Sequence, residues 1–221
     1  MKNGLQESKK ILKEGMDLGK IFFILNHGRE GSKWLKEIIN LDPNALCLHE
    51  PEKQYDYCRN IHPEWNNWRI NQIKIYAKKV DVYGETTPHL FDILDDLITA
   101  FPDATFIHLI RDGRKSARSF YNREPEESLE DHCKWWNTTH KKLYKYFCVG
   151  YKFELLVSNW FYFKSLMNKI GVNIKRSEWK KIIKKKVNST QKWKVPDWDK
   201  TSLKMFWRVC GDTMRKNGYW K

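Results

Sequence analysis

The sequence predicts an α/β domain with a central parallel sheet of about four or five strands and helices on both faces. Short, continuously apolar runs alternate along the chain with segments of helical periodicity, which is typical of such a sheet. Strands that are covered on both faces read as unbroken apolar runs rather than as alternating ones. The length of 221 residues fits one domain over residues 1–221, in which residues 1–19 form an N-terminal helical extension.

Three of the expected strands lie in the first half of the chain, at residues 20–25, 45–49 and 80–84. The first has the sequence KIFFIL and ends in a turn that contains glycine. Apolar residues at helical spacing predict a helix at residues 33–40 and another after Pro88. Each expected strand is thus separated from the next by a connecting segment, as parallel strands require.

The second half of the chain contains the strongest strand, ATFIHLI at residues 104–110, which ends at Arg111. A helix is expected to begin around Lys115. Residues 151–157 are expected to form one more strand. Further helices are expected at residues 126–147, 160–170 and 201–217, and Gly218 is expected to stop the last of them.

The composition excludes several classes of protein. The 11 Trp, 10 Tyr and 11 Phe residues exclude a mainly disordered chain, because so much aromatic surface must be buried. The longest apolar runs are far shorter than the ~20 residues of a membrane-spanning helix, and residues 1–20 lack the apolar stretch of a signal peptide. The five Cys residues are odd in number and show no C-x-x-C spacing, which favours reduced thiols. We expect a soluble, cytoplasmic protein.

The net charge of +14 is concentrated in one part of the chain. Residues 164–194 contain eleven Lys or Arg residues and a single acid, Glu178. Such a run forms either a solvated face or a surface for an anionic partner, so a non-catalytic module that binds polyanions remains an alternative. No helix-turn-helix, zinc-finger, RNP or KH pattern is present, and we expect no nucleic acid partner.

The segment NHGREGSK lies between the first strand and the first helix, where backbone N–H groups and a helix dipole bind phosphate. The candidate binding residues are Gly28, Arg29, Gly31, Ser32 and Lys33. A nucleotide triphosphatase needs Lys directly after the second Gly, and here Lys33 comes one position late. An ordinary turn with a Ser cap and a small kinase-like phosphotransferase both remain alternatives.

A second cluster follows the strand at residues 104–110. Arg111 ends this strand, and Arg114, Arg118 and Ser119 follow at helical spacing. Ligands of open α/β sheets bind at this edge, so the guanidinium groups are candidates for a phosphate site. Asp112 resembles a magnesium-binding aspartate after a strand, but its flanking arginines make a poor magnesium site. Surface arginines without a ligand are the alternative.

Together these two segments resemble the signature regions of the sulfotransferases that use 3′-phosphoadenosine 5′-phosphosulfate. The resemblance implies a P-loop-like sulfotransferase fold in which Arg29, Gly31, Ser32 and Lys33 hold the 5′-phosphosulfate. It implies that Arg111 and Ser119, which keep the family's spacing, bind the 3′-phosphate. Trp34 matches the aromatic residue that packs on adenine in cytosolic members.

The resemblance extends to the C-terminus. Residues 152–156 are similar to an R-Y-E-D-L segment, and residues 187–193 resemble a V-N…K-W stretch of protein-tyrosine and carbohydrate sulfotransferases. Lys192 of that stretch is implied to reach the cofactor phosphate. Residues 52–80 and 122–150 match nothing in the pattern, and we expect acceptor contacts there.

Sulfuryl transfer needs a base for the acceptor proton and cations for the charge on the leaving oxygen. The resemblance implies that Glu50 is the base, with His49 as the weaker candidate, and that Arg29 and Lys33 neutralise the leaving phosphate. No metal is expected, because no cluster of metal ligands occurs. The acceptor partner is expected to carry a hydroxyl group, on a sugar, a phenol or a tyrosine.

One segment departs from the family pattern. Many relatives carry G-E-K-T-P before the helix that leads into the 3′-phosphate strand, but this chain has Thr86 in place of the Lys. In those relatives the Lys aids the leaving sulfate. Either Lys33 takes over this role here, or the enzyme is slower or altered in function. Glu85 is a candidate for acceptor binding, and Thr86 and Thr87 are candidate hydrogen-bond donors.

Overall fold

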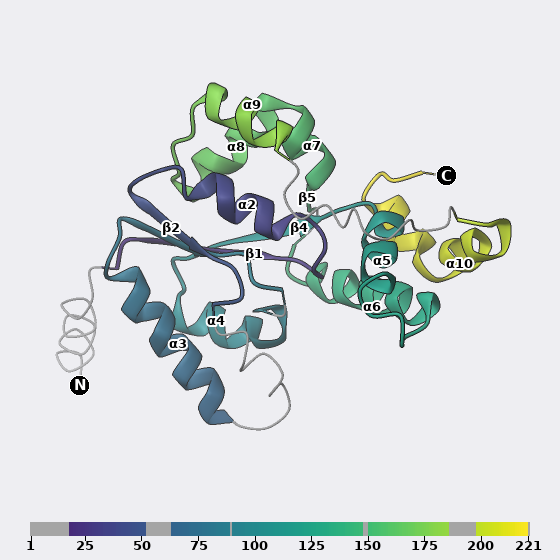
Figure 1. Ribbon diagram of the computed structural model, residues 1–221. Helices are drawn as coiled ribbons and strands as arrows, with labels where there is room; N and C mark the ends of the chain where they lie inside the picture. The colour runs from purple at the N-terminus through teal and green to yellow at the C-terminus, as the bar shows by residue number, and fades with distance from the viewer. Residues whose placement is uncertain (1–17, 52–62, 89, 148–149, 186–197, 221) are drawn as a thin grey trace.

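The computed structural model describes residues 18–51, 63–88, 90–147, 150–185 and 198–220. Five parallel strands form the central sheet in the order β2-β3-β1-β4-β5 (Figure 1). The strands are β1 (Lys20–Leu25), β2 (Ala45–Leu48), β3 (Val82–Glu85), β4 (Thr105–Ile110) and β5 (Tyr151–Lys152). The predicted fold class is therefore confirmed.

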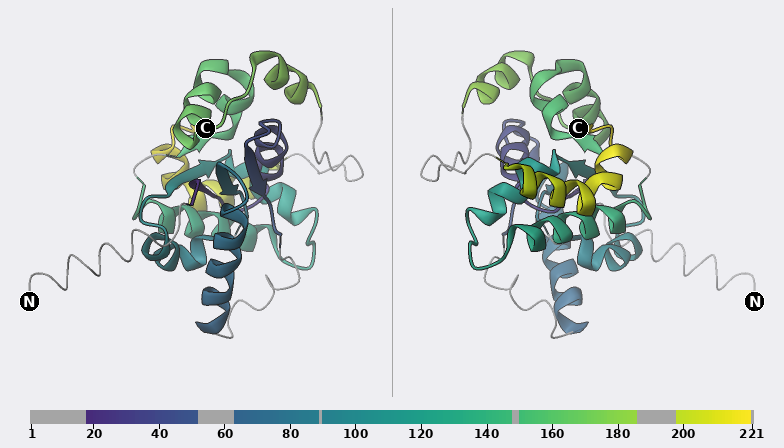
Figure 2. Two further views of the ribbon diagram at one scale, coloured as in Figure 1. Left: turned by 90° about the vertical axis from the view of Figure 1, so that its left-hand side faces the viewer. Right: turned by 90° about the vertical axis from the view of Figure 1, so that its right-hand side faces the viewer.

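Helices cover both faces of the sheet. One face carries α2 (Ser32–Ile39), α7 (Phe153–Ser158), α8 (Trp160–Ile170) and α9 (Arg176–Lys184), and the opposite face carries α3 (Pro63–Ala77), the 3-10 helix η2 (Leu90–Ile93) and α4 (Leu94–Ala100) (Figures 1 and 2). A third group packs together beyond the carboxyl end of β4, and it consists of α5 (Gly113–Tyr121), α6 (Leu129–Leu143) and α10 (Lys200–Lys216).

The central strand β1 shows why both faces need helices. Ile21, Phe23 and Leu25 pack into the cluster under α3 and α4, whereas Phe22 and Ile24 pack into the cluster under α2 and α8. All five side chains are 6% exposed or less. The alternation of side chains along a strand places them on opposite faces, so a continuous apolar run fits a strand with two covered faces.

One of the expected strands is mostly helical in the structure. Residues 151–157 were expected as a strand, but only Tyr151 and Lys152 pair with β4, and the helix α7 begins at Phe153. The apolar residues of α7 recur at helical spacing, which brings Leu156 into the core, and the Lys152 N–H donates to the Tyr162 hydroxyl at 3.0 Å. The prediction of a longer strand was wrong because a short apolar run fits both periods.

The helix α3 was not predicted at all. Its fully buried apolar side chains, Ile73 and Ala77, lie near its end, and Asn66, Asn67 and Asn71 before them weaken the helical pattern in the sequence. The membrane and cysteine predictions also bear on described residues. No helix in those ranges is both long and apolar enough to cross a membrane. Three of the cysteines lie there, and all three are buried and unpaired: Cys47, Cys133 and Cys210.

Candidate active site

The loop between β1 and α2 has three residues in the left-handed region of backbone conformation. Their φ angles are 102° at Gly28, 56° at Arg29 and 98° at Gly31. Gly31 is the N-cap of α2, and no side chain caps the helix there. The first N–H groups of a helix have no partner within the helix and carry the positive end of its dipole. The loop therefore offers the backbone donors and partial charge that bind a phosphate or sulfate group.

The two candidate phosphate segments meet at the carboxyl ends of β1 and β4. The Ser116 hydroxyl donates to the Gly28 carbonyl at 3.1 Å, and the Arg111 Nη1 donates to the Arg29 carbonyl at 2.9 Å. In the other direction, the Arg29 Nε donates to the Ser119 Oγ at 2.8 Å. Ser119 and Arg29, which were assigned to opposite ends of the nucleotide, are thus in direct contact.

The guanidinium groups at this meeting point retain capacity for an anion. Arg111 lies over the Phe153 ring at 5.4 Å, and its buried Nε has no hydrogen-bond partner among the described residues. Burial lowers the pKa of Arg29, and the nearby charges of Arg123 and Arg111 lower it further. An orphaned donor and mutually repelling cations are both stabilised when a phosphate oxygen binds between them.

Phe153 is a contact residue that the sequence did not reveal. A Cβ at Gly31 would lie 2.1 Å from the Cε2 of Phe153, so only glycine leaves room for this ring. The same ring packs edge-on against Trp34, with 5.7 Å between the ring centroids. Phe153 therefore joins the loop to Arg111, and the period-2 pattern expected for residues 151–157 hid this role.

Trp34 and Lys33 occupy different environments although they are neighbours in α2. Trp34 is 6% exposed and packs against both Phe153 and Phe163, so the indole lies in the core and leaves little ring surface for an adenine. The burial does not support the predicted adenine contact. Ser32 begins α2 and is 4% exposed, whereas Lys33 points its charge to the exposed side. Lys192 lies outside the described residues.

Asp112 does not resemble a magnesium ligand in the structure. It is the N-cap of α5, where its carboxylate accepts the Arg114 N–H at 3.0 Å. The same carboxylate accepts from the Arg114 Nε at 3.0 Å and from its Nη2 at 2.8 Å. Such bidentate pairing is geometrically specific and strong. Arg114 and Asp112 satisfy each other, as the flanking charges predicted, and Arg118 lies partly exposed on α5.

The predicted base lies where β2 ends. Glu50 has a φ of 48°, and its N–H donates to the Thr87 hydroxyl at 3.0 Å. The His49 Nδ1 donates to the Thr86 carbonyl at 3.1 Å, which leaves its Nε2 as an acceptor 4.0 Å from the Glu50 carboxylate. Burial lowers the pKa of His49, Glu50 opposes this, and the charge of Lys33 adds to the lowering. His49 is therefore neutral at pH 7, beside both Glu50 and Lys33.

Comparison with known proteins assigns a family to this arrangement. The model of a sulfotransferase family matches residues 25–148, which is more than half of the chain. The chain belongs to the sulfotransferase family. The sulfotransferase also matches a solved structure, the sulfotransferase domain from the Synechococcus PCC 7002 olefin synthase, at a TM-score of 0.51 and 18% identity. The match covers 74% of this chain and 78% of that one, and at this identity it shows the shared fold. No curated protein matches the chain.

The departure of this sulfotransferase at Thr86 has a structural counterpart. Thr86 is 0% exposed, its N–H donates to the Leu48 carbonyl at 2.9 Å, and its own carbonyl receives the His49 proton. The residue therefore ties the end of β2 to the end of β3. Glu85 is also 0% exposed, and its carboxylate is held by Arg69 and by the Tyr83 hydroxyl. The suggestion that Glu85 binds the acceptor is wrong for this conformation, because the group is sealed in the core.

Glu30 is the largest omission from the predicted site of the sulfotransferase. It lies within the loop between β1 and α2 (residues 26–31, called the phosphate loop below), yet it is 0% exposed and contacts α6 through Trp136 and His140. Burial raises the pKa of this carboxyl group, whereas the charge of His27 and the hydrogen bonds that the group accepts act against the rise. No sequence pattern reveals this role, because a single Glu in a polar loop reads as exposed and its partners on α6 are more than one hundred residues away.

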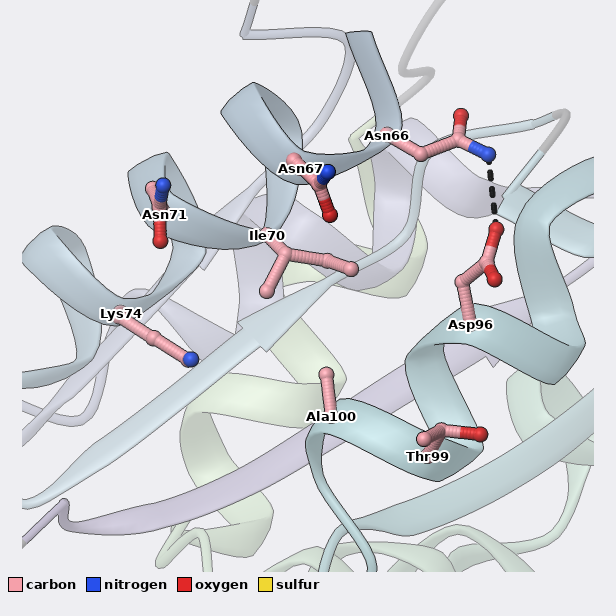
Figure 3. A pocket seen from close by; sticks show the side chains of 8 residues that line it. All are labelled: Asn66, Asn67, Ile70, Asn71, Lys74, Asp96, Thr99 and Ala100. Carbon is pink, nitrogen blue, oxygen red and sulfur yellow. Dashed lines mark hydrogen bonds between the residues drawn. The ribbon is translucent and has the colours of Figure 1, made fainter. Parts of the chain in front are cut away.

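A polar groove of about 530 Å³ lies between α3 and α4, away from this site (Figure 3). The Asn66 side chain bridges the two helices through a 2.7 Å hydrogen bond to Asp96. The remaining lining residues are Asn67, Ile70, Asn71, Lys74, Thr99 and Ala100. None of the predicted nucleotide or catalytic residues lines it, so the groove is separate from the loop at the strand ends.

Proposed function

We propose that this sulfotransferase moves a sulfuryl group from 3′-phosphoadenosine 5′-phosphosulfate to a hydroxyl group of an acceptor. The observation that best supports the proposal is the direct joining of two anion-binding segments. Arg29 of the phosphate loop donates to Ser119 at 2.8 Å and accepts from Arg111 at 2.9 Å. A donor with one phosphate on the ribose 3′ position and another group on the 5′ position requires two such segments side by side.

The 5′-phosphosulfate is assigned to the loop and to the start of α2. The residues proposed to hold it are Gly28, Arg29, Gly31, Ser32 and Lys33. The 3′-phosphate is assigned to Arg111 and Ser119, because the unpartnered Nε of Arg111 needs an acceptor. Lys192 is proposed to close over the phosphates. The donor site then uses both an uncapped helix terminus and charge-assisted hydrogen bonds.

In the proposed reaction the acceptor oxygen attacks the sulfur. A new oxygen–sulfur bond forms while the bond between the sulfur and the bridging phosphate oxygen breaks. The acceptor proton passes to Glu50, and the electron pair of the broken bond stays on the phosphate of the leaving adenosine 3′,5′-bisphosphate. Arg29 and Lys33 stabilise the charge that develops there. We propose no metal ion in this step.

The acceptor is proposed to be a sugar, a phenol or a tyrosine. A first test measures thermal unfolding with adenosine 3′,5′-bisphosphate and, separately, with ATP and magnesium. At a ligand concentration of about 100 times the dissociation constant, the bisphosphate should stabilise the fold by about 2.7 kcal/mol, or about 5–10 °C in Tm. A kinase-like protein would respond to ATP with magnesium instead, and a polyanion-binding module would show no preference between the nucleotides.

The second test supplies radiolabelled phosphosulfate to a panel of phenols, steroids, sugars and tyrosine peptides. Label transferred to a hydroxyl compound supports the proposal and identifies the acceptor class. Binding of the bisphosphate without transfer to any member of the panel would leave the acceptor proposal unsupported. Transfer of a phosphoryl group from ATP to the same compounds would contradict the proposed reaction.

A further inference from the structure

Glu30 is a buried acidic residue whose two carboxyl oxygens have different partners, one in the loop between β1 and α2 and the other on α6. Its Oε2 accepts the His27 backbone N–H at 2.9 Å, three residues back in the same loop. Its Oε1 accepts from the Trp136 Nε1 at 2.9 Å and from the His140 Nε2 at 2.8 Å, both on α6. A weaker contact at 3.4 Å comes from the Arg111 N–H. The two backbone N–H groups and the indole N–H can only donate, so both carboxyl oxygens of Glu30 accept hydrogen bonds.

Two buried histidines fix the direction of this network. Burial lowers the pKa of His140 and of His108 to about 3, so both rings are neutral at pH 7. The His108 Nε2 and the His140 Nδ1 are 2.8 Å apart. A neutral ring has one donor and one acceptor nitrogen. With Glu30 ionised, His140 donates to Glu30 and His108 donates to His140, which leaves only a lone pair at the buried His108 Nδ1 without a partner among the described residues.

The position of Glu30 in the chain allows the hydrogen-bond network to stabilise the backbone conformation of the phosphate loop. The residue lies between Arg29 and Gly31, and both of these have a positive φ. A non-glycine residue in this conformation costs free energy and persists only where the surroundings hold it. The Glu30 side chain accepts the His27 N–H at the start of the loop, and it connects the loop to α6 through its hydrogen bonds with Trp136 and His140. The left-handed turn is thus held from the inside of the molecule.

We propose that Glu30 is a positioning residue for the 5′ end of the sulfuryl donor. Its carboxylate holds the loop so that the Arg29 guanidinium and the first N–H groups of α2 face the bound 5′-phosphate. Glu30 itself does not touch the donor. The inference rests on the proposed function and adds to it a residue that acts mainly at one end of the nucleotide. Arg111 follows β4 and Ser119 lies in α5, and Glu30 contacts this pair directly through the weak 3.4 Å hydrogen bond from the Arg111 N–H.

The substitution Glu30→Gln tests this proposal with almost no change in shape. An amide has one acceptor oxygen, so its NH2 group must face either the His27 N–H or the two donors of α6. The dissociation constants of adenosine 3′,5′-bisphosphate and of adenosine 5′-phosphate should rise about 10- to 100-fold, as for the loss of charge-assisted hydrogen bonds. The dissociation constant of adenosine 3′-phosphate should stay within about twofold. A general disturbance of the fold would weaken all three nucleotides alike.

Asp42→Asn is the matched control. Asp42 is 6% exposed and accepts the backbone N–H groups of Asn44 at 3.0 Å and Asn173 at 2.7 Å, at the far end of α2. The same change from carboxylate to amide should lower stability there without altering the ratio of the three dissociation constants. A Glu30→Gln protein that is folded and has wild-type dissociation constants for all three nucleotides would overturn the proposal.

A second pair of variants covers the case in which Glu30→Gln does not fold. His140→Leu removes one donor to Glu30, and His140→Gln retains a donor at the same position. We expect His140→Leu to weaken adenosine 5′-phosphate binding and His140→Gln to restore most of it. Equal effects of the two substitutions would overturn the role of the hydrogen bond.

A ligand-free measurement separates this proposal from the proposed function. Hydrogen exchange of the amides at residues 27–34 should be about tenfold faster or more in Glu30→Gln, while the amides of α8 stay unchanged. If the wild-type protein binds none of the three nucleotides, the proposed function fails and the exchange rates alone decide whether Glu30 positions the loop. Unchanged exchange in the loop would then overturn the inference.

Discussion

At the carboxyl end of β2, two neighbouring side chains offer a lone pair to an acceptor proton. The His49 Nδ1–H is committed to the Thr86 carbonyl, so its Nε2 is free of a proton, and the Glu50 carboxylate lies 4.0 Å from that nitrogen. The Glu50 side chain is 25% exposed and that of His49 is 16% exposed. The backbone of Glu50 is fixed by Thr87. The more accessible group is Glu50, which favours it as the base.

Glu50→Gln should lower turnover about 10²- to 10⁴-fold, because general-base catalysis contributes this much. The affinity for adenosine 3′,5′-bisphosphate should stay nearly unchanged, since Glu50 has no part in the proposed phosphate contacts. Steady-state kinetics with the identified acceptor, together with calorimetric binding of the bisphosphate, measure both quantities. His49→Gln is the companion variant. If Glu50→Gln keeps the full rate and His49→Gln loses it, the base is His49.

Arg111→Ala should weaken the binding of adenosine 3′,5′-bisphosphate by about 1.5–3 kcal/mol, the cost of a lost charge-assisted contact. The variant should bind the bisphosphate and adenosine 5′-phosphate with equal affinity, because the 3′-phosphate no longer has its partner. Arg114→Ala is the control, since Arg114 is already paired with Asp112. A preference for the 3′-phosphate that survives in Arg111→Ala would refute the assignment.

The sequence can indicate a candidate site residue when its role depends on neighbouring residues in the chain, but not when it depends on distant segments. Arg29, Ser32 and Arg111 could be predicted as candidate binding residues because a strand end followed by a helix is itself a binding feature. Glu30 and Phe153 could not, since their roles depend on contacts with segments far away in the chain. Trp34 shows the opposite case. The resemblance implied that Trp34 packs on adenine, but its position in α2 places the ring in the core.

At the scale of the elements, the turn into α2 depends on Gly31. Gly31→Ala places a Cβ 2.1 Å from the Phe153 ring and puts a side chain at a φ of 98°. We expect the free energy of unfolding to fall by about 2–5 kcal/mol, from backbone strain and overpacking together. The affinity for adenosine 5′-phosphate should fall as well. Denaturant unfolding and calorimetric binding measure the two effects.

Gly211→Ala is a matched control for this substitution. Gly211 lies inside α10, where a Cβ would meet the flexible end of Arg215 at 3.2 Å and the Trp207 ring at an ordinary contact distance of 3.5 Å. Alanine is preferred to glycine inside a helix, so this variant should be more stable by about 0.5–1 kcal/mol. A Gly31→Ala protein as stable as Gly211→Ala would contradict the strained turn.

The elements that could be predicted are those with one unambiguous period. β1 and β4 are rich in apolar residues and lie in the sheet as expected, and α8 matches its predicted bounds. α9 lies inside the basic stretch of the sequence and buries only Trp179 and Ile182, so its pattern was masked by the exposed cations around them. α7 was assigned to a strand because six residues are too few to distinguish the two periods.

At the scale of the whole molecule, the stability should depend on pH through groups that are buried without charge. Burial lowers the pKa of His108 and His140 to about 3, far below the value of 6.5 for an exposed His. On acidification below about pH 6.5 the unfolded chain binds protons at these two groups and the folded chain does not. Stability therefore falls as the pH falls, with up to about 1.4 kcal/mol per pH unit from each His.

Glu30 acts in the opposite direction on the same measurement. Burial raises its pKa, so the folded chain binds a proton at Glu30 before the unfolded chain does, and this offsets part of the loss. Burial also lowers the pKa of His49, which adds to the loss. The histidines outnumber the single carboxyl group. The net expectation is a free energy of unfolding that decreases from pH 7.5 to pH 5.5.

Urea unfolding at pH 7.5, 6.5 and 5.5 measures this dependence, and His108→Gln isolates one contributor. Glutamine does not titrate, so the variant should lose less stability per pH unit than the wild type, by up to about 1.4 kcal/mol. The variant is expected to be less stable at pH 7.5, because it disturbs the His108–His140 hydrogen bond, and the comparison is therefore made on slopes. Equal slopes in the two proteins would mean that His108 is protonated in the folded state. A protonated His108 donates from both nitrogens. The hydrogen bonds from His108 to His140 and from His140 to Glu30 would then keep their direction. The buried Nδ1 of His108 would, however, need an acceptor, and the described residues provide none.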